Sequence, residues 1–98
     1  MRTEVSCRRM ELTPAIQDYA EKRCEKLLKY FNGVQEFEVV LEKAEKGDFH
    51  AEIIAAVVNH DDMVASARGV DVYACIDEAS DKLARQLHDF KERLKSHH

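Results

Sequence analysis

The chain has 98 residues, of which 45% are hydrophobic and 35% are charged, and its formal net charge at pH 7 is -4. This length fits one compact domain, and the composition excludes a disordered or fibrous chain. No apolar run approaches the roughly 20 residues that span a bilayer, and the N-terminus lacks the apolar stretch of a secretory signal. We therefore expect one domain over residues 1–98, located in the cytoplasm and not at a membrane.

The beginning of the chain predicts a strand followed by a helix. Apolar and polar residues alternate between positions 2 and 10, which is the period-two pattern of a half-buried strand. The stretch "LTPAIQDYAEKRCEKLLKYFNG" has apolar residues at helical spacing. Thr13 can cap this helix, and Pro14 suits its first position because that N–H would have no partner in a helix. The pair Asn32-Gly33 predicts the end of the helix.

Three strands are predicted next. Phe37, Val39 and Leu41 alternate with glutamates in "VQEFEVVLEKAEKGD", which indicates a strand with one solvated, acidic face. The stretches "FHAEIIAAVVNHDD" and "MVASARGVD" predict two further strands, and "EKGD" and "NHDD" are the turns before and after the first of them. Short connections between consecutive strands favour an antiparallel meander.

A second long helix is predicted from about Asp71, where the helical period returns. The element order is therefore strand, helix, three strands, helix. A four-stranded sheet with two helices on one face buries both apolar stripes at once. We expect an α+β fold, a two-layer β-α-β-β-β-α sandwich.

The charges are distributed unevenly along the chain. Residues 34–62 hold eight acidic residues and two lysines, a local balance of -6, whereas residues 82–95 hold five basic and two acidic residues, a balance of +3. In the first helix Lys22, Lys26 and Lys29 share one face, and in the second helix Lys82, Arg85 and Arg93 lie on one side of the apolar stripe. If the helices pack side by side, the two basic ridges could adjoin across an outer groove that suits a polyanion such as RNA.

A simpler interpretation of the same lysines is that they form surface ion pairs. Asp18 and Glu25 precede Lys22 and Lys29 by four residues, a spacing that aids helix stability and solubility. Spacing alone favours this simpler interpretation over the groove.

A more specific indication comes from "ASARGVDVYACIDEASDKLARQL", residues 65–87. This segment closely resembles the ribosome hibernation-promoting factor family, also called the ribosome-associated inhibitor or protein Y family. Its members place a D-x-Y-A-A-I-D stretch just before a D-K-L-x-R-Q helix. The matching residues here are Asp71, Tyr73, Ala74, Ile76, Asp77, Asp81, Lys82, Leu83, Arg85 and Gln86. The stretch "ELTPAIQDYAEKRCEKLLKYF" resembles the family as well, so the resemblance covers essentially the whole chain.

The resemblance implies a β-α-β-β-β-α domain, similar to the double-stranded-RNA-binding fold, and a non-enzymatic role without a cofactor. Family members bind ribosomal RNA of the small ribosomal subunit in the channel used by messenger RNA and transfer-RNA anticodon stems. They thereby block translation under stress or in stationary phase. The chain resembles the short family form, which has no C-terminal dimerisation domain. We expect a monomer that either acts beside a separate ribosome-dimerising factor or holds single ribosomes inactive.

The resemblance also implies which residues contact RNA. Arg85 is the first candidate because its guanidinium can donate two hydrogen bonds to one phosphate. Tyr73 could stack on a base or could pack against the protein. The sequence departs from the family at Asp89, whose carboxylate would repel phosphate. The candidate RNA-binding residues are Lys22, Arg23, Lys26, Tyr73, Lys82, Arg85, Lys91 and Lys95.

An enzyme is the first alternative class of function. An enzyme would have to use His60, Asp61 and Asp62, with His50, as a metal or acid-base site, but a turn is a poor place to fix ligands. No phosphate-binding loop or nucleophile elbow is present, so we expect no catalysis and no metal. The three cysteines show no CxxC spacing and are predicted to be reduced, buried thiols.

A protein-binding module is the second alternative. An acidic sheet face bearing Glu36, Glu38 and Glu42 could dock a basic partner, which fits the older description of the family as modulators of an alternative sigma factor. Such a face could equally be a solvated surface whose charges prevent edge-to-edge aggregation.

Overall fold

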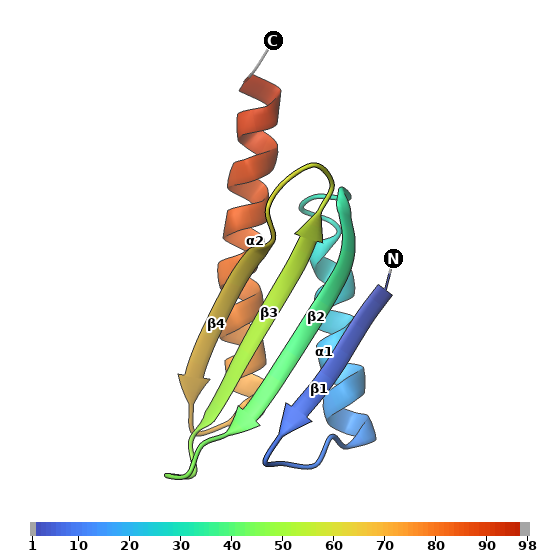
Figure 1. Ribbon diagram of the computed structural model, residues 1–98. Helices are drawn as coiled ribbons and strands as arrows, with labels where there is room; N and C mark the ends of the chain where they lie inside the picture. Colours follow the sequence, from blue (N-terminus) through green and yellow to red (C-terminus); the bar gives the residue numbers. More distant parts are fainter. Residues whose placement is uncertain (1, 97–98) are drawn as a thin grey trace.

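The computed structural model describes residues 2–96 and shows two helices packed on one face of a four-stranded sheet (Figure 1). The sheet order is β1-β2-β3-β4, with β1 parallel to β2 and the other neighbours antiparallel. The predicted α+β class, element order and meander are thus confirmed. The elements are β1 (Arg2–Arg8), α1 (Pro14–Leu27), β2 (Val34–Lys43), β3 (Phe49–Val57), β4 (Met63–Gly69) and α2 (Val72–Ser96).

The core lies between the sheet and the two helices. The strand register places Val39 beside Ile53 and Ile53 beside Ala65, so one row of apolar side chains crosses the covered face. α1 packs against β1 and α2, and α2 packs against β3 and β4. Leu83 and Leu87 of α2 are fully buried against the strands. Removing this much apolar surface from water is the main force that holds the two layers together.

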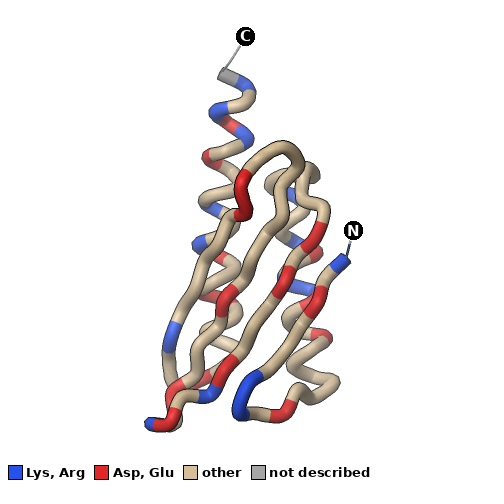
Figure 2. The backbone as a smooth tube through the Cα atoms, viewed as in Figure 1, with Lys and Arg blue, Asp and Glu red and all other residues tan. Residues whose placement is uncertain are grey.

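The other face of the sheet is not covered by any element that the structure describes (Figure 1). Figure 2 shows acidic positions along β1, β2 and β3, and both basic and acidic positions along the last turns of α2. Glu38 is exposed, Glu36 and Glu42 are half-buried, and the side chain of Arg2 pairs with Glu4 and lies 4.0 Å from Glu36. The predicted acidic strand face is therefore present.

The first helix begins as predicted but ends earlier than predicted. Thr13 Oγ1 accepts a hydrogen bond of 3.2 Å from the Ile16 N–H, which confirms the cap. The helix ends at Leu27, and the prediction that it continues to Asn32-Gly33 is wrong. The N–H groups of the next three residues, Leu28, Lys29 and Tyr30, bond to carbonyls three residues back, which tightens the chain into a turn.

The turn after α1 positions Phe31 for packing against α2. The half-buried ring of Phe31 lies edge to face with Phe90 at a centroid distance of 5.3 Å. A Cβ on Gly33 would approach the Phe31 ring to 2.4 Å. Gly33 therefore leaves room for the Phe31 ring and does not terminate the helix.

The second helix begins where it was predicted to begin. The Asp71 carboxylate accepts a hydrogen bond of 3.0 Å from the Tyr73 N–H. α2 then runs past the end of the sheet, so its last turns project from the body of the protein (Figure 1). Neither of the two helices in residues 2–96 is both long enough and apolar enough to cross a membrane.

Candidate nucleic-acid interface

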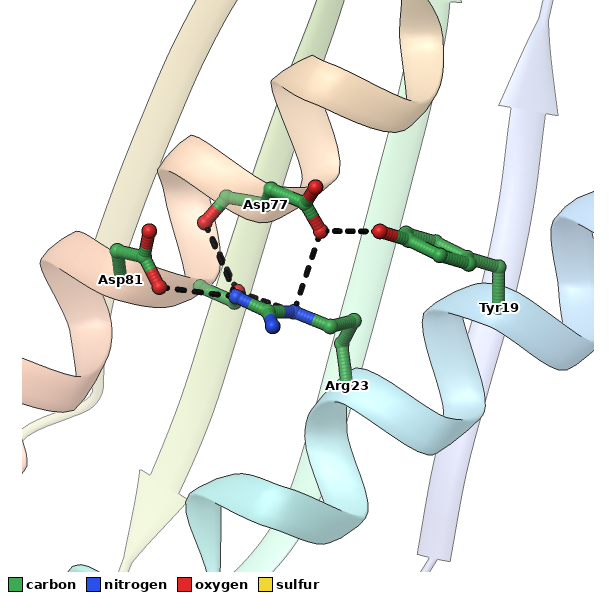
Figure 3. A network of polar contacts seen from close by, with 5 residues as sticks. Tyr19, Arg23, Asp77 and Asp81 are labelled. Atoms are coloured by element: carbon green, nitrogen blue, oxygen red, sulfur yellow. Dashed lines mark hydrogen bonds and ion pairs between the residues drawn. The ribbon is translucent and has the colours of Figure 1, made fainter.

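Arg23 lies between the two helices and joins them through a polar network (Figure 3). Its Nε and Nη2 donate to the Ser80 hydroxyl at 2.9 and 2.6 Å, and Nη2 also donates to Asp81 Oδ1 at 2.9 Å. Nε lies 3.3 Å from Asp77 Oδ1. Ser80 is almost fully buried and the Arg23 side chain is only 24% exposed. The sequence predicted that Arg23 contacts RNA. The structure instead places its charge beside the acidic residues Asp77 and Asp81 of its own chain.

Tyr19 extends the same network. Its hydroxyl donates a hydrogen bond of 2.5 Å to Asp77 Oδ1, and this hydrogen bond, with burial and the negative charge of Asp77, raises the pKa of Tyr19. The Tyr73 ring lies edge-on to the Tyr19 ring, 5.1 Å away at 89°. Tyr73 thus has a packing role and remains 37% exposed, and its contact with a base stays a prediction.

Lys82 lies on the side of α2 that faces β4. Its Nζ donates to the Ser66 carbonyl at 3.0 Å, and Gln86 Nε2 donates to the Val64 carbonyl at 2.9 Å. These two side chains cover carbonyls of the edge strand that have no partner strand on that side. Lys82 does not adjoin the basic face of α1, because α1 contacts α2 at Asp77 and Asp81 whereas Lys82 is bonded to β4.

The remaining basic candidates differ in how strongly they are paired. Lys22 forms the predicted surface ion pair with Asp18, at 3.1 Å, and Lys95 Nζ lies 3.7 Å from Glu92. Within residues 2–96, the side chains of three others form no hydrogen bond or ion pair. These three are Lys26 and Arg85, which are exposed, and Lys91, which is half-buried.

An open depression of about 470 Å³ lies where the turn after α1 meets the outer face of α2. We call it the helix-end depression, and its lining residues are Tyr30, Asp81, Ala84, Arg85, His88 and Asp89. Sequence reasoning missed Tyr30 and His88. Tyr30 was placed inside a longer helix, so its position in a turn beside Arg85 was not foreseen.

His60 lies in the turn between β3 and β4 and, like the cysteines, has a packing role. His60 Nδ1 lies 2.7 Å from the Asp61 carbonyl, and its ring packs on Phe90 with a centroid distance of 4.6 Å. Among the described residues, no group of three or more potential ligands could hold a metal ion. All three cysteines are free thiols, and burial raises the pKa of Cys24 to about 12.

Known proteins share both the sequence pattern and the fold of this chain. The family model described as "Sigma 54 modulation protein / S30EA ribosomal protein" matches residues 3–95. The ribosome hibernation promoting factor of Escherichia coli strain K12 is 38% identical over 97 residues, which cover 99% of this chain and 100% of that protein. The protein of the same name from Azotobacter vinelandii is 33% identical over 95% of this chain and 85% of its own length.

Solved structures agree with these sequence matches. The N-terminal domain of Thermus thermophilus protein Y is 34% identical, with a TM-score of 0.78 over 91% of this chain and 94% of that chain. A ribosomal subunit interface protein from Coxiella burnetii matches with a TM-score of 0.84 over 94% of this chain and 99% of that chain. At 17% identity, the second match shows similarity of fold alone.

Proposed function

We propose that this chain, which belongs to the sigma 54 modulation protein / S30EA ribosomal protein family, binds ribosomes and promotes their hibernation. In this proposal it binds ribosomal RNA in the messenger- and transfer-RNA channel of the small subunit and thereby blocks translation under stress or in stationary phase. It acts in the cytoplasm as a single ribosome-binding domain, as a monomer and without a cofactor or catalysis. The name of the full-length relatives supports the proposal.

One observation about charge supports RNA as the target. Lys26 and Arg85 are exposed and Lys91 is half-buried on the helical layer, and none of the three has a partner within residues 2–96. The acidic residues Glu36 and Glu38 alternate with the buried Phe37 and Val39, which places them on the opposite, open face of the sheet. Neutralising RNA phosphates releases condensed counterions, so cations that are not already paired contribute most to such binding.

The other candidates take secondary roles in this proposal. Lys22 and Lys95 would exchange a carboxylate partner for a phosphate, which reduces their net contribution. Lys82 would contact RNA only by giving up its bond to Ser66. Arg23 acts by fixing α1 against α2, and Tyr73 lies at the start of α2 with part of its ring exposed.

The experiment that tests the proposal is co-sedimentation with purified ribosomes at low and high salt. The test variant carries Lys26→Ala and Arg85→Ala, and the matched control is Glu38→Ala on the open face. We expect wild type and Glu38→Ala to pellet with the small subunit or the intact ribosome at low salt, and high salt to release both. The double variant is expected to stay in the supernatant. A wild-type protein that never pellets with ribosomes contradicts the proposal.

A second candidate function is protein binding through the open face. The observation in its favour is that Glu38 and Ile54 pair across β2 and β3 on a face that no described element covers, with half-exposed Val64 beside them. A basic protein would be the fitting partner, since opposite charge steers docking. If only Glu38→Ala loses binding in the co-sedimentation experiment, the open face and not the helical layer is the binding surface.

A further inference from the structure

The helix-end depression brings an exposed aromatic ring together with charged side chains of α2. Positions 81, 84, 85 and 88 lie on one face of α2, and Tyr30 closes the depression from the turn after α1. Ala84 is partly buried and its small side chain leaves room between the larger ones. We propose that the depression binds a single unpaired base of RNA and prefers guanine. This inference rests on the proposed function and specifies the RNA feature that the surface recognises.

Tyr30 supplies the stacking surface in this proposal. It is 44% exposed, while its N–H is fixed by a 3.0 Å hydrogen bond to the Leu27 carbonyl. The next residue, Phe31, is anchored by its edge-to-face contact with Phe90. The ring of Tyr30 is therefore held on a well-fixed backbone while it remains open to solvent. Stacking on an exposed aromatic ring is the common way in which proteins hold unpaired bases.

The charged residues of the depression complement guanine more fully than the other bases. Guanine presents the acceptors O6 and N7 and the donors N1–H and N2–H₂. Arg85 has the fork of donors that matches O6 and N7, and the carboxylate of Asp89 can accept from N1–H and N2–H₂. Adenine and cytosine lack the imino N–H, and uracil has only one donor on its base-pairing edge.

This arrangement also gives Asp89 a role. The sequence suggested that its carboxylate would weaken binding by repelling phosphate. In the structure Asp89 lines the same depression as Tyr30 and Arg85. A carboxylate that accepts hydrogen bonds from the edge of a base favours one base over the others, even where its charge lowers the affinity for RNA phosphates. Asp81 also lines the depression, but its Oδ1 is bonded to Arg23.

The test is a titration of the isotopically labelled protein with each of the four 5′-ribonucleoside monophosphates, followed by amide NMR. Because all four carry the same phosphate, differences between them report on the base. We expect GMP to shift the signals of Tyr30, Ala84 and Arg85, with a dissociation constant about threefold or more below those of AMP, CMP and UMP. The dispersion of each spectrum shows that each variant is folded.

Four variants separate the contributions. Tyr30→Ala is expected to weaken GMP binding about tenfold, and Tyr30→Phe, which keeps the stacking ring, by less than about twofold. Asp89→Asn is expected to remove the preference for GMP, because the amide offers one acceptor oxygen where the carboxylate has two. Val70→Ala, at an 85% exposed position before α2, is the matched control and should bind like wild type.

The outcomes distinguish this inference from the proposed function. If no nucleotide shifts these signals, or if Tyr30→Ala binds like wild type, the base site is wrong, and co-sedimentation with ribosomes decides the proposed function independently. Equal affinity for all four nucleotides overturns the guanine preference. If the protein binds GMP but does not pellet with ribosomes, the base site is confirmed and its role in ribosome hibernation is wrong.

Discussion

The role of Arg23 as a link between the helices predicts a specific loss of stability. In Arg23→Ala the protein loses two hydrogen bonds to the buried Ser80 hydroxyl, one to Asp81, one to the Asp77 carbonyl and the 3.3 Å ion pair with the Asp77 carboxylate. The Asp81 and Asp77 side chains are 69% and 42% exposed, so solvent screens these ion pairs and they contribute little. The bonds to Ser80 are desolvated and charge-assisted, and together they contribute about 2 kcal/mol. The expected loss in the free energy of unfolding is therefore about 2 kcal/mol.

The assay is urea denaturation followed by circular dichroism, combined with a double-mutant cycle between Arg23→Ala and Ser80→Ala. We expect a coupling energy of about 1 kcal/mol, because each single change already removes the shared bonds. Lys22→Ala is the control, and its exposed pair with Asp18 should change stability by less than about 0.5 kcal/mol. A loss below about 0.5 kcal/mol for Arg23→Ala, or strictly additive effects in the cycle, refutes the reasoning.

Three further predictions concern the packing. Gly33→Ala should lower the denaturation midpoint, because the new Cβ would lie 2.4 Å from the Phe31 ring; an unchanged midpoint would mean that the ring moves freely. Leu83→Ala should cost about 2–5 kcal/mol in the same urea assay, since Leu83 is fully buried; a loss under about 1 kcal/mol would show that the core collapses around the gap. Burial raises the pKa of Cys24 from its ordinary 9.0 to about 12, so its stabilising contribution is complete below pH 9.0 and is lost as pH rises toward 12. Stability should therefore fall more steeply between pH 9.0 and 12 in wild type than in Cys24→Ala, and equal slopes would contradict this.

The element order could be predicted because it depends on local patterns. The change from a period of two to a helical period marks each boundary, and Thr13-Pro14 and Asp71 supply start signals that need no distant partner. The end of α1 could not be predicted in this way. The turn that follows it leads Phe31 onto Phe90, a contact between segments far apart in the sequence.

The candidate site was predicted only in part, for the same physical reason. A helical wheel groups Lys82 with Arg85, but it does not tell which side of α2 faces α1. The pairing of Arg23 with Asp77 and the bond from Lys82 to Ser66 fix that geometry, and both arise from packing between elements. The family membership could be recognised from the sequence because the motif between residues 65 and 87 is local.

The parallel pairing of β1 with β2 has a consequence for the order in which the protein folds. β2, β3 and β4 are joined by short turns and can form by closing small loops. β1 reaches its place only across the whole of α1, which carries a larger loss of chain entropy. We therefore expect the meander to form before β1 docks. On this reasoning a destabilising change in β1, such as Val5→Ala, accelerates unfolding and leaves the folding rate nearly unchanged.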